Sequence, residues 1–149
     1  MRSSLASIGV LVVLVMAAGL AQAEPPVGVV KVVQGEAFVG RAGLSLPARE
    51  GMGLAEGDVL RTGADGRLGV LLRDDTRLSL GPGAELRIDR FAFAPAQGNL
   101  ALVLRLVRGA ATYVSGKIAK LAPEAVRIET PVGIVGVRGT QFAARIEPE

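Results

Sequence analysis

The sequence contains no cysteine, no histidine and no tryptophan. Without cysteine and histidine the chain has no disulfides, no thiol nucleophile, no imidazole base and none of the common zinc ligand sets. Aromatic residues make up only 3% of the chain, although sugar-binding platforms and single-stranded nucleic-acid grooves both depend on exposed rings. We therefore expect no metal, no cofactor and no nucleic-acid partner.

A block of charge of one sign is also missing. The 17 basic and 14 acidic residues are interspersed along the chain and give a net charge of only +3. A nucleic-acid-binding face usually gathers its lysines and arginines in one stretch or stripe. The observed distribution therefore gives such a function little support.

Glycine, proline and aliphatic residues are abundant instead. The 149 residues include 20 glycines and 8 prolines, and 50% of the chain is hydrophobic. So many helix breakers argue against long helices, and with few aromatics the core must be built from Val, Leu, Ile and Ala. The length fits one domain, which we expect to be all-β.

The N-terminus has the pattern of a secretory signal peptide. Arg2 supplies a positive charge, residues 8–20 form an uncharged apolar run, and Ala21-Gln22-Ala23 is a small-x-small cleavage signal. The run is short for a membrane-spanning helix, which needs about 20 residues, and a retained anchor is the alternative. We expect a signal peptide over residues 1–23, a Pro-rich lead-in over 24–26 and one periplasmic or secreted domain over 27–149.

Alternating hydrophobicity predicts the main strands. Apolar residues occupy every second position of residues 68–72 and again of 78–80, on either side of Asp74-Asp75. This pattern predicts a β-hairpin around a solvated Asp-Asp turn. Leucine at every second position of residues 100–106 predicts a central strand that ends at Arg108-Gly109.

Shorter strands should complete the domain. Residues 27–33 and 36–40 predict a hairpin through Gln34-Gly35, with Gly35 at positive φ. Turn signals recur roughly every 8 to 12 residues, as in sandwiches and barrels. We therefore expect short, mostly antiparallel strands packed as a β-sandwich or a β-solenoid-like stack.

Two connections lack a clear strand pattern. Residues 90–98 look irregular, and we expect Phe91 and Phe93 there to cap the core. Residues 115–123 form a basic loop with Lys117 and Lys120, which is either an ordinary solvated loop or a contact surface. We favour the solvated loop.

The most unusual stretch covers residues 130–142. It places Pro131, Gly133, Gly136, Arg138 and Gly139 among β-branched residues, a mixture that neither a helix nor a plain strand favours. Proline belongs at a strand start or an edge, whereas Ile134 and Val135 favour an extended, half-buried path. The stretch is therefore either an exposed sheet edge or a buried strand.

Arg138 has two interpretations. It either pairs inside the fold with a carboxylate such as Glu129 or Asp58, or it contacts an anionic ligand or a partner. Structural arginines are common and nothing catalytic stands beside this one, so we favour the internal role. Asp58 itself follows Gly57 in a predicted turn, where it accepts a backbone hydrogen bond rather than binding a cation.

No constellation of residues indicates an enzyme. A hydrolase or transferase needs a nucleophile with its base, paired carboxylates or a metal. The nearest approach is Ser115 with Lys117, two positions apart in the basic loop. We therefore expect a non-catalytic protein.

The stretch 130–142 also resembles the closing motif of the FecR-type periplasmic domain. The matching string is Thr-Pro-x-Gly, followed by Val-Arg-Gly-Thr-x-Phe, and Gly57-Asp58 with Thr62 resembles the opening motif of that domain. The resemblance spans residues 27–146. It marks these motif positions as candidate partner-binding residues: Asp58, Thr62, Thr130, Pro131, Gly133, Arg138, Gly139, Thr140 and Phe142.

The resemblance implies a periplasmic domain that senses the signalling domain of an outer-membrane transporter and relays its state to a sigma factor. Regulators of this family carry a cytoplasmic helical segment before a membrane span, whereas this sequence opens on the signal segment. We therefore expect a stand-alone, exported recognition or signal-sensing module, with membrane contact only through the export signal.

We expect the partner of this module to be an envelope protein, bound by β-augmentation on a free sheet edge. The alternatives are a structural envelope protein that assembles through its sheet edges, and a cell-wall or polysaccharide-binding module.

Overall fold

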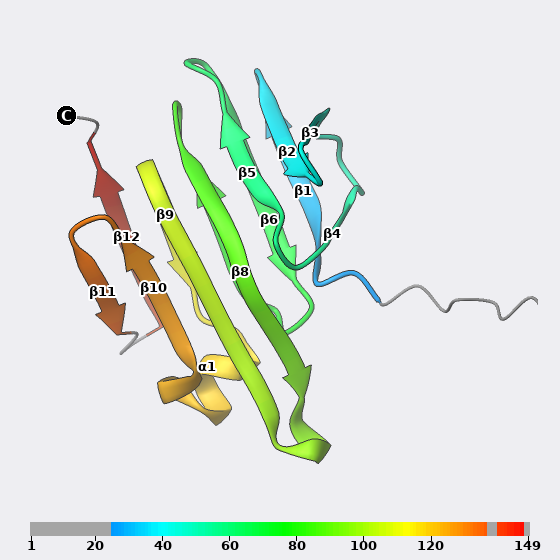
Figure 1. The fold of residues 1–149 in the computed structure, drawn as a ribbon, viewed down its shortest axis with the longest axis vertical. Helices are drawn as coiled ribbons and strands as arrows, with labels where there is room; N and C mark the ends of the chain where they lie inside the picture. The colour runs from blue at the N-terminus through cyan, green and yellow to red at the C-terminus, as the bar shows by residue number, and fades with distance from the viewer. Residues whose placement is uncertain (1–24, 137–139, 148–149) are drawn as a thin grey trace, which may run out of the picture.

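The computed structural model describes residues 25–136 and 140–147 and is built almost entirely of β-strands (Figure 1). The all-β prediction is confirmed. Pairing is antiparallel throughout the described strands except between β9 (Asn99–Val114) and β10 (Val126–Thr130), which are parallel. A parallel pair needs a crossover connection, and residues 115–125 supply it.

The strands form two layers that share β9. Layer 1 contains, in spatial order, β4 (Gly53–Leu54), β1 (Gly28–Gln34), β6 (Arg67–Leu72), β7 (Arg77–Leu80), the C-terminal part of β9 and β12 (Gln141–Ile146). Layer 2 contains β3 (Leu44–Pro47), β2 (Ala37–Arg41), β5 (Val59–Thr62), β8 (Glu85–Ala94), the N-terminal part of β9, β10 and β11 (Gly133–Gly136). The sheet therefore curls around its own core, because one strand passes through both layers.

Strand β9 organises the fold. Its Leu102, Leu104 and Leu106 are buried and confirm the predicted central strand. The predicted end at Arg108-Gly109 is wrong, because the strand continues to Val114. Gly109 takes a φ of +79° at the point where β9 leaves layer 2 and enters layer 1. A conformation that is easy only for glycine therefore bends the strand instead of ending it.

A single hydrophobic core fills the space between the layers. Layer 1 contributes buried side chains such as Val30, Val70 and Leu80, and layer 2 contributes others such as Leu60 and Ile88. All of them come from positions of strict alternation, which places every second side chain on the inner face. Each such side chain stabilises the fold by about 1.5–3 kcal/mol relative to an exposed one.

The predicted hairpin over residues 67–80 is present as β6 and β7, with Leu68 opposite Leu80. Its turn is not solvated as expected. Asp74 is buried and accepts hydrogen bonds from both the amide and the hydroxyl of Thr76 and from the amide of Ile118. The carboxylate thus joins the β6–β7 turn to the start of a helix that lies far away in the sequence.

The predicted hairpin through Gln34-Gly35 is not formed. Gly35 has the expected positive φ of 62°, but β1 pairs with β6 and β4, whereas β2 pairs with β3 and β5. The short connection carries the chain from layer 1 to layer 2, so the two segments lie in different layers.

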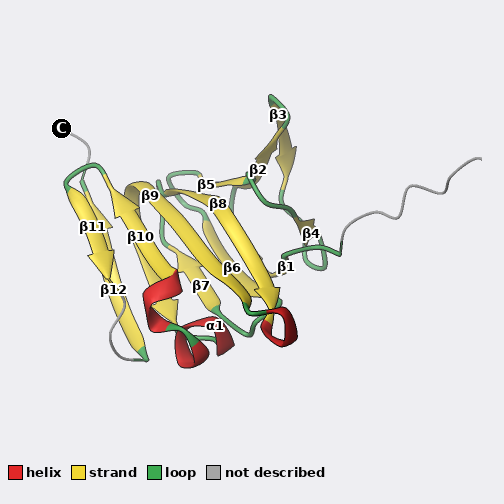
Figure 2. Cartoon of the chain, turned by 60° about the horizontal axis from the view of Figure 1, so that its bottom comes forward, coloured by secondary structure: helices red, strands yellow, loops and turns green. Residues whose placement is uncertain are grey.

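Two further predictions need correction. Strand β8 runs through residues 90–94, where an irregular segment was expected, and a 3₁₀ turn, η1 (Pro95–Gln97), follows it. Phe91 is buried in the core and Phe93 packs against it, as predicted. The basic loop after β9 contains α1 (Lys117–Leu121) and η2 (Pro123–Ala125), and Ile118 anchors α1 in the core. Figure 2 shows the short helices gathered at one end of the strands.

Candidate functional site

Asp58 lies inside the fold and braces two strands of layer 2. Its carboxylate is 1% exposed and accepts hydrogen bonds from Nε and Nη2 of Arg41, at 2.9 and 2.6 Å. It also accepts the amide of Ala55 at 2.8 Å, so the predicted turn bond goes to a preceding residue and not to a following one. The hydrogen bond to Asp58 raises the pKa of Arg41. Both carboxylate oxygens thus bind Arg41, which ties the end of β2 to the residue that precedes β5.

This bidentate pair gives a stability prediction. Arg41→Ala should lower the free energy of unfolding by about 1–3 kcal/mol, because it leaves a buried carboxylate without its charged partner. Arg61→Ala is the matched control, since Arg61 and Glu85 form an exposed ion pair in the same layer and such pairs contribute about 0–1 kcal/mol. Urea denaturation measures both variants. If Arg41→Ala and Arg61→Ala lowered the free energy of unfolding equally, the assigned role of Asp58 would be contradicted.

Thr62 is a second internal residue. Its hydroxyl donates to the carbonyl of Gly81 at 2.6 Å and accepts the amide of Ala84 at 2.8 Å. The side chain therefore satisfies the backbone of the turn between β7 and β8, which is where the chain crosses from layer 1 to layer 2. Neither Asp58 nor Thr62 is available to a partner.

Thr130, Pro131 and Gly133 form the exposed turn of the β10–β11 hairpin. The Thr130 hydroxyl donates to the carbonyl of Gly133 at 2.8 Å and accepts the amide of Val132 at 3.3 Å. Pro131 has no amide hydrogen to satisfy, so it suits the outer side of this turn. The motif residues close the hairpin and present Val132, which is 87% exposed.

Strand β11 is a free edge of layer 2. Within the described residues it pairs only with β10, with Ile134 opposite Glu129 and Val135 opposite Ile128. The predicted half-buried path is wrong, because Ile134 is 63% exposed and Val135 is exposed as well. An unpaired edge with apolar side chains is unusual, since it offers a template for strand pairing.

A groove of about 550 Å³ borders this hairpin on the outer face of layer 2. Val107, Pro131 and Ile134 supply part of its apolar lining. Arg105 donates to Glu129 at 2.9 Å beside it, and this hydrogen bond raises the pKa of Arg105. The groove therefore combines apolar surface with an ion pair directly next to the free edge.

The second part of the motif belongs to layer 1. The amide of Ser115 donates a hydrogen bond to the carbonyl of Thr140. The Phe142 ring packs against that of Tyr113, with 5.1 Å between the ring centroids. Burial raises the pKa of the Tyr113 hydroxyl. Thr140 and Phe142 therefore anchor β12 to the C-terminal part of β9, and the motif spans both layers.

Arg138 and Gly139 lie outside the described residues, so their predicted roles remain predictions. Both carboxylates that we considered as internal partners of Arg138 already form ion pairs. Asp58 pairs with Arg41, and Glu129 pairs with Arg105 and Arg127.

A metal site and a Ser-Lys pair each require a particular arrangement of side chains. Within residues 25–136 and 140–147 no group of three or more carboxylates is placed to hold a metal ion. Lys117 of the considered Ser-Lys pair forms an exposed ion pair with Asp75 at 3.2 Å. In the same part of the chain no helix has the length and apolar character needed to cross a membrane.

These features define a curled all-β domain. Its most distinctive surface is the apolar edge strand β11, which follows the Thr-Pro-x-Gly turn. The chain belongs to the FecR family, whose model, described as FecR protein, matches residues 58–149. This family is regulatory and signal-sensing rather than enzymatic, and its members are typically associated with the cell envelope.

The match begins at β5, yet strands β1 to β4 complete both layers of the same sheet. No curated protein and no solved structure matches the chain significantly.

Proposed function

We propose that the chain is an exported, non-catalytic FecR-type module that recognises a protein of the cell envelope by adding a partner strand to β11. The observation that carries this proposal is the free edge itself, which exposes backbone hydrogen-bonding groups together with Ile134 and Val135. Extended peptides bind such edges through main-chain hydrogen bonds, and neighbouring pockets select their side chains.

The groove beside the hairpin is the pocket that such a strand would use. It lies on the same face of the sheet as Ile134, because Ile134 is directly opposite Glu129 and both line the groove. A partner strand next to β11 would place every second side chain on this face. One apolar side chain of the partner can therefore enter the groove while the backbone pairs with β11.

In-cell photo-crosslinking tests this function. A photoreactive amino acid in place of Val132 should capture an envelope protein in living cells. Ile134→Lys should reduce the yield about tenfold, because it removes apolar contact area and puts a charge at the edge that a new strand must approach.

Leu44→Lys is the matched control. Leu44 is also 63% exposed and lies in β3, the edge strand at the other end of layer 2. The proposal expects the control to leave the crosslink unchanged. Crosslinks only to a second copy of the chain would favour a structural, self-assembling role, and no crosslink at all would contradict recognition through this edge.

A further inference from the structure

The described strands of layer 1 carry basic side chains on their outer face and no acidic ones. The strands β1, β6, β7 and β12 and residues 109–114 of β9 contain Lys31, Arg67, Arg77 and Arg145 but no Asp or Glu. Lys31, Arg67 and Arg77 are exposed and form no ion pair with any described residue. Arg145 contacts Glu147 only at 3.9 Å.

The outer face of layer 2 also carries arginines, but there they form ion pairs with carboxylates. There Arg61 pairs with Glu85 at 2.8 Å, and Arg105 bridges Asp89 at 3.3 Å and Glu129 at 2.9 Å. Five arginines of this face share three carboxylates in ion pairs: Arg61, Arg87, Arg105, Arg108 and Arg127 with Glu85, Asp89 and Glu129. The two faces therefore differ in pairing: these arginines of layer 2 have carboxylate partners, whereas Lys31, Arg67 and Arg77 of layer 1 have none among the described residues.

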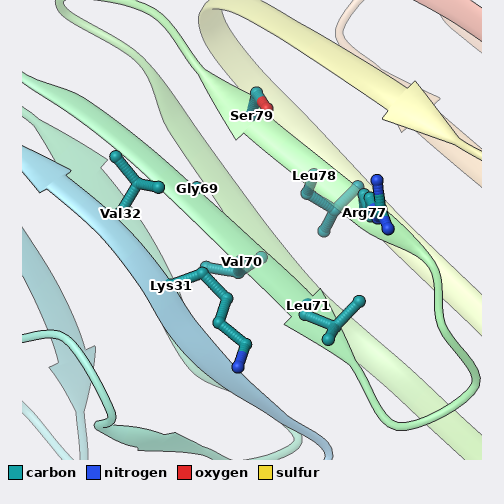
Figure 3. A pocket seen from close by; sticks show the side chains of 8 residues that line it. All are labelled: Lys31, Val32, Gly69, Val70, Leu71, Arg77, Leu78 and Ser79. Carbon is teal, nitrogen blue, oxygen red and sulfur yellow. The ribbon is translucent and has the colours of Figure 1, made fainter.

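A hollow of about 310 Å³ lies in the middle of the basic face. Gly69 has no side chain and stands between Val32 on β1 and Ser79 on β7, so the surface is recessed there. Figure 3 shows Lys31 and Arg77 on the two strands that flank β6 at this hollow. The recess is lined largely by aliphatic groups and bordered by a cation on each side.

We propose that this face is a second docking surface, which binds an acidic segment of a partner protein. An aliphatic side chain of the segment, about the size of leucine, fills the hollow over Gly69. Carboxylates on either side of it meet Lys31 and Arg77. The charge complementarity sets the orientation and the rate of encounter, and the filled hollow supplies apolar burial.

The chemistry of the face favours a peptide over other polyanions. A single-stranded nucleic acid needs aromatic rings for base stacking, and the exposed side chains of this face include none. An anionic bilayer is bound best by several protruding apolar and aromatic groups, whereas the described strands of this face expose one large apolar side chain, Val32, beside the hollow.

A titration of the full ¹⁵N-labelled chain with synthetic peptides tests the proposal. The sequence Glu-Glu-Leu-Glu-Glu should shift the amide resonances of β6 and β7. Gln-Gln-Leu-Gln-Gln, which lacks the charge, and Glu-Glu-Gly-Glu-Glu, which lacks the apolar side chain, should both bind more weakly. Higher salt should weaken the binding of the acidic peptides, since exposed charges are screened.

Two variants separate charge from shape. Arg77→Glu should weaken binding of the acidic leucine peptide about tenfold. Ser79→Leu should fill the hollow and remove the advantage of leucine over glycine in the peptide. Arg127→Glu is the control, since it makes the same charge change on the exposed outer face of layer 2.

The docking surface is overturned if Arg77→Glu has no effect, if the neutral peptide binds equally well, or if no peptide shifts the β6 and β7 resonances. It is also overturned if phosphatidylglycerol vesicles or oligothymidylate occupy the face more tightly than the peptide. Ile134→Lys should leave peptide binding unchanged, so failure of this surface and failure of the β11 edge are distinguishable.

Discussion

Gly109→Ala is expected to lower the free energy of unfolding by about 3–5 kcal/mol, or to prevent folding altogether. A Cβ atom at this position would lie 2.5 Å from Cα of Ala84 and 2.7 Å from its Cβ. The φ of +79° adds a second cost, because alanine avoids the left-handed region. Because β9 passes from one layer to the other at this bend, a change in the bend should destabilise both layers.

Gly43→Ala separates these two costs. Gly43 has nearly the same φ, +77°, but no atom lies within 4 Å of the position that a Cβ would take. The control should lose only about 1 kcal/mol. Urea denaturation can be followed by the fluorescence of Tyr113, the single tyrosine of the chain, which is buried in the C-terminal part of β9. Equal losses in the two variants would contradict the close approach of β9 to Ala84.

Asp74→Asn is expected to cost at least about 2 kcal/mol. The buried carboxylate accepts the Thr76 hydroxyl at 2.8 Å and the amides of Thr76 and Ile118 at 3.1 and 3.2 Å. An asparagine replaces one acceptor oxygen with an amide donor, so at least one buried donor loses its partner. Faster amide hydrogen exchange in α1 would locate the damage at the helix that Asp74 holds.

Asp75→Asn is the control for this change. Asp75 is the next residue of the same turn, but its carboxylate is exposed and forms a surface ion pair with Lys117. Asparagine also tolerates the positive φ of 71° at this position. The control should stay within about 0.5 kcal/mol of the wild type. A similar loss of stability in both variants would mean that the conformation of the turn, and not the buried carboxylate, stabilises this part of the fold.

Strands with clean alternation could be predicted from the sequence. Residues 68–72 and 100–106 show their inward side chains at every second position, and this is a local signal. Which strands pair is a non-local property, so the two segments around Gly35 looked like a hairpin although they belong to different layers. Gly109 looked like a strand end for a similar reason. The close approach of Ala84, which is distant in the sequence, is visible only in the folded chain.

The candidate site was predicted only in part. The motif includes Thr130, Pro131 and Gly133, which do form the exposed hairpin turn, but it equally includes Asp58 and Thr62, which lie inside the fold. A motif does not distinguish residues that build a fold from residues that meet a partner. The run at Ile134 looked half-buried because β-branched residues suit edge strands and covered strands alike.

The basic face could not be predicted from the sequence. Its cations are separated along the chain, and acidic residues stand between them in the sequence. In the fold these acidic residues lie outside the strands of this face. Lys31 and Arg77 are brought to the same hollow only by the pairing of β1 with β6 and of β6 with β7. The fold therefore decides which outward-facing cations meet a carboxylate and which, like Lys31 and Arg77, do not.

The most direct test of recognition through β11 is amide hydrogen exchange, measured on the free protein and on its complex with the partner captured at Val132. If a partner strand adds to the edge, exchange in β11 should slow by at least about tenfold in the complex, because its free amides become hydrogen-bonded. Exchange in β3, the other edge of layer 2, should not change. Unchanged exchange in β11 within a complex that protects other strands would contradict the account.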